Sequence, residues 1–255
     1  MHIDLNCDMG ESFGRYTIGD DAALLDIVTS ANVACGFHAG DPEVMARTVA
    51  CAVENGVAIG AHPGYPDLQG FGRRDLAMTA EALKAGLIYQ IGALSAFARA
   101  AGTALTHVKP HGALYNAAAR DASIAETIAE AVHALDAALI VVTQPHTPLA
   151  EAARNMGLQV VLEGFADRAY QPNGTLRPRS LPGAVLHRPN AIAERAVRMV
   201  KDRQVEAYTG EEIPLEIDTL CVHGDTPGAE AIARAVRDAL ERAGIDVRPI
   251  AMRAG

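Results

Sequence analysis

Short apolar runs alternate with amphipathic stretches along this 255-residue chain. The runs are of strand length, and the stretches between them carry apolar residues at helical spacing. This alternation is typical of βα units on a parallel sheet. Strands are expected at Ile3–Cys7, Ser30–Cys35, Val57–Ala61, Thr106–Val108, Ala138–Thr143, Gln159–Glu163, Ala184–Leu186 and Thr219–Val222, and helices at Pro42–Asn55, Ala80–Ala101, Ser123–Leu135, Thr147–Met156, Ala191–Asp202 and Pro227–Ala243.

Seven or eight parallel strands fit a closed barrel better than an open sheet. We therefore predict an α/β fold, a TIM-like (β/α) barrel of seven or eight strands, with residues 1–255 forming one domain. Asp41 and Asp225 each precede a predicted helix that begins with proline within two residues. Both aspartates are therefore expected to be helix caps before they are expected to take part in chemistry.

Polar residues recur where the predicted strands end. Histidines beside glycines follow four of the apolar runs, and an alternating polar set lies in the first one. These residues are His38, His62, His111 and His223, with Asp4, Asn6 and Asp8. Because the carboxyl ends of parallel strands meet at one mouth of a barrel, the pattern predicts an active site there.

The composition excludes several classes of protein. The formal net charge is −9, so a nucleic-acid partner is not expected. The four cysteines are scattered without a C-x-x-C pair, which fits buried thiols in a reducing cytosol. The chain begins Met1-His2-Ile3-Asp4 without a signal-peptide pattern, and its longest apolar runs are too short to span a membrane. We expect a cytoplasmic protein.

The first predicted strand carries an acidic set. Asp4, Asn6 and Asp8 alternate, so their side chains share the face that points into the barrel, and Glu11 follows closely. Neighbouring carboxylates there supply a general acid or base, or bind a metal. Asp8 with His38 and His62 would make a two-histidine, one-carboxylate site for a divalent metal. The alternatives are histidines that only form hydrogen bonds, and an Asp8 and Glu11 that only shape the turn at Gly10.

Lys109 and His111 are expected to share a face at the end of the fourth strand. A lysine in the mouth would suit a phosphate or a developing oxyanion, and a Schiff-base role is a further possibility. The alternative is a structural lysine that forms an internal ion pair with Asp4 or Glu163.

Two long segments, residues 63–78 and 164–183, interrupt the alternation and carry arginines. Loops of this length inside a domain are usually functional or disordered. Arginines in an acidic protein suggest anion binding, and the alternative is a solvated basic surface. The candidates for substrate or phosphate binding are Asn6, Arg73, Arg74, Tyr115, Arg168 and Arg177.

Several common site motifs are absent from the sequence. No G-x-x-x-x-G-K-[ST] loop occurs, and no G-x-G-x-x-G opens a helix, which argues against a P-loop or Rossmann nucleotide site. No G-x-S-x-G elbow is present either, so a serine hydrolase is not expected.

Six blocks of sequence together resemble the LamB/YcsF family, the A component of bacterial ATP-dependent 5-oxoprolinase. In chain order they are Asp4–Gly14, Asn32–Pro42, Gly60–Arg74, Val108–Asn116, Glu163–Tyr170 and Cys221–Gly228. The resemblance covers essentially the whole chain. It implies a barrel related to those of glycoside hydrolases and polysaccharide deacetylases. It also implies conversion of 5-oxo-L-proline, water and ATP to L-glutamate, ADP and phosphate, together with two other subunits, the B and C components.

A lactam is a poor electrophile, and phosphorylation of its oxygen would make the ring carbon open to attack by water. Such chemistry needs a base, a proton donor for nitrogen, and cations for the phosphate and the carboxylate. The residues expected to provide the catalytic groups are Asp8, Glu11, His38, His62, Lys109, His111, Glu163 and His223. Two alternatives remain: a stand-alone metal-dependent amide or carbohydrate deacetylase, and a non-catalytic subunit that delivers substrate to its partners.

Overall fold

A computed structural model describes residues 1–224 and 228–250. Within these residues, seven parallel strands form a closed barrel. The strands are β1 (His2–Met9), β2 (Ser30–Ala34), β3 (Ala58–His62), β4 (His107–Val108), β5 (Ile140–Thr143), β6 (Val160–Phe165) and β9 (Thr219–Val222). The barrel closes where β9 pairs with β1, with Asp4 opposite Thr219 and Cys7 opposite Val222. The TIM-like barrel expected from the sequence is confirmed, with the lower of the two strand numbers.

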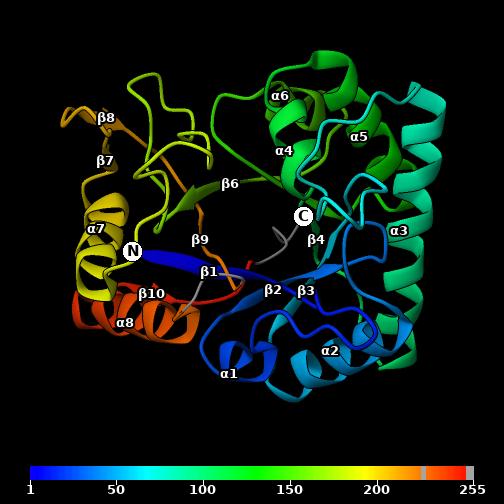
Figure 1. The fold of residues 1–255 in the computed structure, drawn as a ribbon, viewed down its shortest axis with the longest axis horizontal. Helices are drawn as coiled ribbons and strands as arrows, with labels where there is room; N and C mark the ends of the chain where they lie inside the picture. The colour runs from blue at the N-terminus through cyan, green and yellow to red at the C-terminus, as the bar shows by residue number, and fades with distance from the viewer. Residues whose placement is uncertain (225–227, 251–255) are drawn as a thin grey trace.

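Helices surround the barrel, as Figure 1 shows. They are α1 (Asp21–Leu25), α2 (Pro42–Glu54), α3 (Ala80–Ala100), α4 (Gly112–Ala118), α5 (Ala122–Leu135), α6 (Pro148–Asn155), α7 (Pro189–Lys201) and α8 (Ala229–Arg242). Asp41 caps α2 as expected, because its carboxylate accepts hydrogen bonds at 2.9 Å from the backbone N–H groups of Glu43 and Val44. The corresponding expectation for Asp225 lies outside the described residues.

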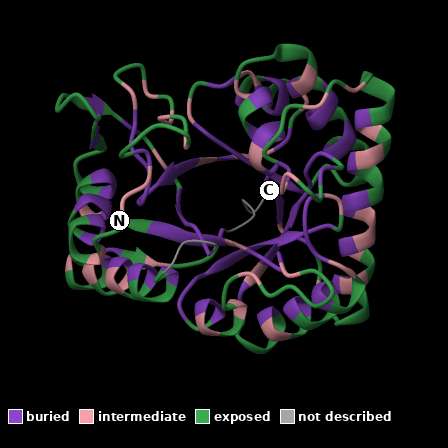
Figure 2. Cartoon of the chain, viewed as in Figure 1, coloured by how far each residue is buried: buried purple, intermediate pink, exposed green. Residues whose placement is uncertain are grey.

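The strands separate an apolar layer from a polar one. On β1, the side chains of Ile3, Leu5 and Cys7 are buried in the main hydrophobic cluster, which the helices complete. The alternate residues Asp4 and Asn6 are also buried, but they bond to polar groups of neighbouring strands. Figure 2 shows the buried strands within a ring of helices that are exposed on their outer faces. The apolar core therefore lies around the barrel, which leaves the interior for polar chemistry.

Five short elements were not among those expected from the sequence. They are α1, α4, the two strands of a hairpin, β7 (Gln204–Glu206) and β8 (Glu212–Pro214), and β10 (Asp246–Val247), which pairs with the start of β1. The prediction of a strand at Ala184–Leu186 was wrong. In the part of the chain that the structure describes, this stretch offers only an isolated bridge between Val185 and Arg168. It belongs to a long loop whose turns set its conformation.

Among the described residues, none of the helices is both long and apolar enough to cross a membrane.

Candidate functional site

The polar strand ends meet at one mouth of the barrel, as the sequence predicts. A cavity of about 430 Å³ opens there, between the ends of the strands and the long loops 63–78 and 164–183. Its lining includes Asp8, Glu11, His62, Lys109, His111, Tyr115, Arg73, Arg168, Arg177 and His223. Asn6, His38 and Glu163 are fully buried against this group.

A hydrogen-bonded layer beneath the cavity fixes the position of Asp8. The amide nitrogen of Asn32 donates to Asp8 at 2.9 Å and to the amide oxygen of Asn6 at 2.8 Å. His107 Nε2 lies 2.8 Å from the Asn32 amide oxygen and donates to it, which sets the orientation of that amide. Asn6 in turn donates to Glu163 at 3.2 Å. Each amide therefore has one orientation that satisfies its neighbours.

Lys109 is clamped between two carboxylates. Its ammonium lies 2.9 Å from Asp8 Oδ1 and 2.6 Å from Glu163 Oε1, and its side chain is only 3% exposed. Burial alone would lower the pKa of Lys109, but the neighbouring negative charges, those of Asp8 and Glu163 among them, raise it well above its usual value. Lys109 is therefore a fixed cation, which argues against a Schiff-base role.

The sequence suggested an ion pair of Lys109 with Asp4 or with Glu163. The pair with Glu163 is present, and none with Asp4 is found within the described residues. Asp4 instead accepts hydrogen bonds from Thr29 at 2.8 Å, from Ser30 at 2.6 Å and from Thr219. The two groups lie on different levels of the barrel, since Asp4 precedes Asp8 by four residues on β1. Asp4 thus belongs to the floor of the barrel and Lys109 to its mouth.

Asp8 stays ionised. Burial would raise the pKa of Asp8, but the adjacent His62 imidazole and Lys109 ammonium hold it well below its usual range. The other carboxylate of the clamp, Glu163, accepts a hydrogen bond of 2.6 Å from the hydroxyl of Tyr115. Burial and the charge of Glu163 raise the pKa of Tyr115 well above its usual value, so this hydroxyl keeps its proton.

His223 forms a pair with Asp167 on the opposite side of the mouth. Its Nδ1 lies 2.9 Å from both carboxylate oxygens of Asp167 and donates to them. Burial would raise the pKa of Asp167, but His223 and two arginines lower it. The His223 ring also stacks on Phe165, with 5.6 Å between centroids. The carboxylate thus fixes the ring so that Nε2 is the nitrogen left to accept a proton, the arrangement of a general base.

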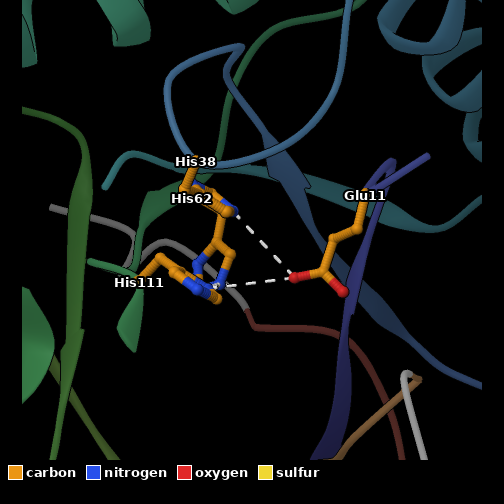
Figure 3. Close-up of side chains that lie close together, drawn as sticks. All are labelled: Glu11, His38, His62 and His111. Carbon is orange, nitrogen blue, oxygen red and sulfur yellow. Dashed lines mark hydrogen bonds and ion pairs between the residues drawn. The ribbon is translucent and has the colours of Figure 1, made fainter. Parts of the chain in front are cut away.

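Three histidine rings and Glu11 gather at another wall of the cavity (Figure 3). His62 Nε2 and His111 Nδ1 lie 2.9 Å apart, and the His38 ring stacks on His111 with centroids 3.8 Å apart. The carboxylate of Glu11 points toward the rings, 3.8 Å from His111 Nδ1 and 4.0 Å from His38 Nε2.

The loop 63–78 lies directly over these rings. A Cβ atom placed on Gly72 would approach His38 Cβ to 2.7 Å and His111 Cδ2 to 2.8 Å, and Gly72 has a φ of +62°. Both facts require glycine at this position. The carbonyl of Phe71 accepts a hydrogen bond of 2.8 Å from His111 Nε2. The loop therefore orients the histidines as well as covering them.

Arginines form the outer rim of the cavity. Arg73, Arg168 and Arg177 line it as the sequence suggests. Arg168 is partly engaged in structure, because it donates to the carbonyl oxygens of Ala184 at 3.2 Å and Arg177 at 2.7 Å. Burial lowers the pKa of Arg168 to about 10, which still leaves it charged at neutral pH. The rim can therefore hold an anionic group above the buried ammonium.

The structure does not bring Arg74 to this rim. Within the described residues Arg74 lies outside the cavity lining, and its guanidinium binds the carboxylate of Asp67 with contacts that include one of 2.9 Å. Asp67 also accepts a hydrogen bond of 3.0 Å from the backbone of Gly70, so the pair braces the loop. A role of Arg74 in binding anions remains a prediction.

Comparison with known proteins places this architecture in a family. The sequence model described as LamB/YcsF family matches residues 3–254. The chain belongs to the LamB/YcsF family. The A component of 5-oxoprolinase from Pyrococcus furiosus is 54% identical over 98% of each chain. The corresponding protein of Paracidovorax citrulli is 55% identical over 98% of this chain and 100% of its own.

Solved structures give the same result at the level of the fold. The crystal structure of a lactam utilization protein from Thermus thermophilus has a TM-score of 0.94 and 52% identity, and it covers 98% of this chain and 100% of its own. A family 4 carbohydrate esterase from Streptomyces lividans, 12% identical, has a TM-score of 0.50 over 100% of this chain and 95% of its own. That distant likeness concerns the barrel alone.

The LamB/YcsF barrel groups its possible metal ligands differently from the expected trio of Asp8, His38 and His62. His38 and His62 lie with Glu11 and His111, with one donor atom of each within 4.8 Å of the others. Asp8 forms a second such group with Cys221 and His223, although its Oδ2 atom is also 3.3 Å from His62 Nε2. The first group offers three imidazoles and one carboxylate, a donor set that suits zinc or a similar divalent ion.

Several residues of this LamB/YcsF site were not identified from the sequence. They are Asn32, His107, Cys221, Phe165, Asp75 and Arg120. Asp167 and Arg179 lie in the long loop 164–183 that the sequence singled out. Alternation along β2 could have revealed Asn32, because Ser30 and Asn32 share the face that Asp4, Asn6 and Asp8 share on β1. No sequence signal pairs Asp167 with His223, which lies 56 residues away.

Proposed function

We propose that this chain is the A component of an ATP-dependent 5-oxoprolinase, and that its barrel mouth opens 5-oxo-L-proline by hydrolysis to L-glutamate while ATP is hydrolysed to ADP and phosphate. The names of its relatives, which include 5-oxoprolinase components and a lactam utilization protein, support this proposal. The observation that carries it is the cavity itself, in which a base, a buried cation and an arginine rim face one space.

His223 is the best candidate for the base. Its Nδ1–H is held by Asp167, so Nε2 can take a proton from a water molecule that attacks the lactam carbon. The same nitrogen can then return the proton to the ring nitrogen as the C–N bond breaks, as one histidine does in serine proteases. The fixed orientation of the imidazole lowers the entropic part of the barrier.

Lys109 is the candidate for stabilising negative charge on the lactam oxygen or on a phosphoryl group attached to it. Its ammonium is held in place by Asp8 and Glu163 before the substrate arrives, so little reorganisation is needed as charge develops. The arginine rim suits the carboxylate of 5-oxoproline and the phosphate. The cavity volume of about 430 Å³ falls within the usual range for small-molecule sites.

We assign ATP binding to the complex of this chain with its partner subunits, because the chain has no recognised nucleotide-binding motif of its own. The sequence has no P-loop, and the naming of relatives as one component of 5-oxoprolinase implies partners. We propose that the B and C components are needed for ATP-driven turnover. A subunit that only delivers substrate is less consistent with a buried ammonium and a histidine–aspartate pair, because such groups are unfavourable in a core unless a function requires them.

The test measures glutamate and phosphate release from 5-oxoproline and ATP by the chain alone and by the chain combined with the B and C components. We expect turnover only with all three, and a loss of about 100-fold or more when the chain carries His223→Gln. Strong ATP-driven turnover by the single chain would contradict the need for partners. Nucleotide-independent cleavage of an N-acetylated sugar by the single chain would favour a deacetylase instead.

A further inference from the structure

The hydrogen bonds of two histidines fix which nitrogen of each ring carries a hydrogen. His62 Nδ1 lies 2.7 Å from the carbonyl oxygen of Lys109, and His111 Nε2 lies 2.8 Å from that of Phe71. A carbonyl oxygen only accepts, so both of these nitrogens donate. The remaining nitrogens, His62 Nε2 and His111 Nδ1, therefore carry lone pairs whenever the rings are neutral.

These two lone pairs face each other across 2.9 Å. Two acceptors at that separation repel, so a positive species has to lie between or beside them, either a shared proton or a metal ion. Ligand atoms 2.0–2.1 Å from a metal are about 2.8–3.4 Å apart for angles between a right angle and the tetrahedral value. The observed separation is close to the lower value.

His38 distinguishes the two explanations. The residue is 0% exposed, and neither ring nitrogen has a hydrogen-bond partner among the described residues. A buried imidazole without partners is unfavourable, and a proton shared by His62 and His111 would leave it so. The carboxylate atom Glu11 Oε1 is 4.0 Å from His38 Nε2, which is too long for a hydrogen bond.

We propose that Glu11, His38, His62 and His111 bind one divalent metal ion of the zinc class at the wall of the cavity. One donor atom of each residue lies within 4.8 Å of the others. Figure 3 shows the four side chains close together. Binding by all four requires the His38 and His111 rings to rotate out of their parallel arrangement, whose interplanar angle is 3°.

This metal site would take part in the proposed 5-oxoprolinase reaction. Its catalytic role rests on that proposed function, whereas the binding of the ion does not. Glu11, His62 and His111 line the same cavity as Lys109 and His223. When bound, an ion of this kind supplies Lewis acidity to a carbonyl oxygen or lowers the pKa of a water molecule. Binding of the ion itself needs neither substrate, ATP nor partner subunits.

The experiment is done on the full chain after treatment with a chelator and dialysis. Zn²⁺ is titrated by calorimetry, and Co²⁺ is titrated by visible absorption, which reports nitrogen and oxygen ligation. We expect one ion per chain, with affinity reduced about 100-fold or more by Glu11→Gln and by His38→Gln. Circular dichroism verifies that each variant is folded. The two substitutions lie in different loops, so a folding failure of one variant leaves the other as a test.

His223→Gln and Cys221→Ser are the matched controls, because both residues belong to the neighbouring donor group. They should leave Zn²⁺ affinity within about threefold of that of the unchanged chain. If the control variants lost Zn²⁺ binding while His38→Gln kept it, the ion would be bound by the group of Asp8, Cys221 and His223. That result would overturn the proposal. A folded chain that takes up no ion would also overturn it and leave the shared proton as the explanation. Neither result depends on turnover.

Discussion

At the scale of single residues, His223 depends on the carboxylate behind it. Asp167→Asn replaces an acceptor by a group that can donate to Nδ1, so the ring would present the wrong tautomer to the cavity. We expect kcat of the assembled enzyme to fall about 10²–10⁴-fold. The measurement is steady-state kinetics over a range of pH, with the chain in complex with the B and C components.

Asp20→Asn is the matched control for that change. Asp20 caps α1 and accepts a hydrogen bond of 3.2 Å from the backbone of Ala23, a role that asparagine can keep. Its kcat should equal that of the unchanged chain. An Asp167→Asn enzyme with normal kcat and an unaltered pH profile would remove the His223 pair from the mechanism.

Lys109 combines a structural role with a chemical one. Lys109→Met strands Asp8 and Glu163 as buried carboxylates, so we expect the free energy of unfolding to fall by about 3–5 kcal/mol, together with loss of turnover. Adding Glu163→Gln to Lys109→Met should restore part of that free energy. Urea denaturation of both single variants and the double variant measures the coupling. Additive losses would show that the ion pair contributes nothing of its own.

His107 links stability to pH. Burial lowers the pKa of His107 to about 3 from an ordinary value of 6.5. Between these values the unfolded chain binds a proton that the folded chain does not, so stability is full above about pH 6.5 and falls as the pH falls. From pH 6.5 to 5 this group should remove about 2 kcal/mol.

Urea denaturation at several pH values tests this prediction. His107→Gln should weaken the pH dependence by that amount, even if its absolute stability is lower. His133→Gln, at an exposed position of α5, is the control and should leave the slope unchanged. Equal slopes in all three chains would show that His107 titrates normally.

At the scale of elements, β3 has to leave room for the His107 ring. A Cβ atom on Gly60 would overlap His107 Nε2, the nitrogen that donates to Asn32. Gly60→Ala should therefore lower the free energy of unfolding by about 1–3 kcal/mol through overpacking. A thermal or urea melt measures the effect.

Gly92→Ala provides the contrast, because nothing lies within 4 Å of a Cβ at this position in the middle of α3. Replacing glycine within a helix should stabilise the chain by roughly 0.5–1 kcal/mol. If both substitutions changed stability in the same direction by similar amounts, the close packing of β3 against His107 would not be the cause.

Sequence patterns revealed the long elements and missed the short ones for a physical reason. α3 spans 21 residues, enough for several turns of helical spacing, whereas α1 has 5 residues and α4 has 7. Fewer than two turns cannot show a period. β4 was found although it has only 2 residues, because Pro110 and Gly112 follow it and mark the end of the strand. The hairpin of β7 and β8 forms outside the barrel and follows no alternation.

The site was predictable in its members more than in its pairings. Strand ends converge in any parallel barrel, so the histidines and Lys109 could be placed at the mouth from the sequence. Which carboxylate meets which cation depends on strand register and on distances across the barrel. Lys109 is 101 residues from Asp8 in the sequence. Arg74 pairs with Asp67, which lies in the same irregular loop. Such contacts leave no periodic trace in the sequence.

At the scale of the whole molecule, the apolar core lies between barrel and helices and does not include the cavity wall with Glu11, His38, His62 and His111, the residues of the proposed metal site. The fold should therefore form without an ion. We expect a chelator to lower the melting temperature by less than about 10 °C, since a ligand at 100 times its Kd adds about 2.7 kcal/mol. Differential scanning calorimetry with and without EDTA measures this, and unfolding at room temperature on chelation would contradict it.

The interior layer of Asn6, Asn32, Asp8, Lys109 and Glu163 also constrains how this barrel can diverge. Each member is bonded to at least two others or to His107, so a change at one position leaves a buried donor or acceptor without a partner. Evolution would have to replace these residues in concert. In an alignment of relatives, these positions should covary with one another, while the apolar residues on the outer faces of the same strands drift independently.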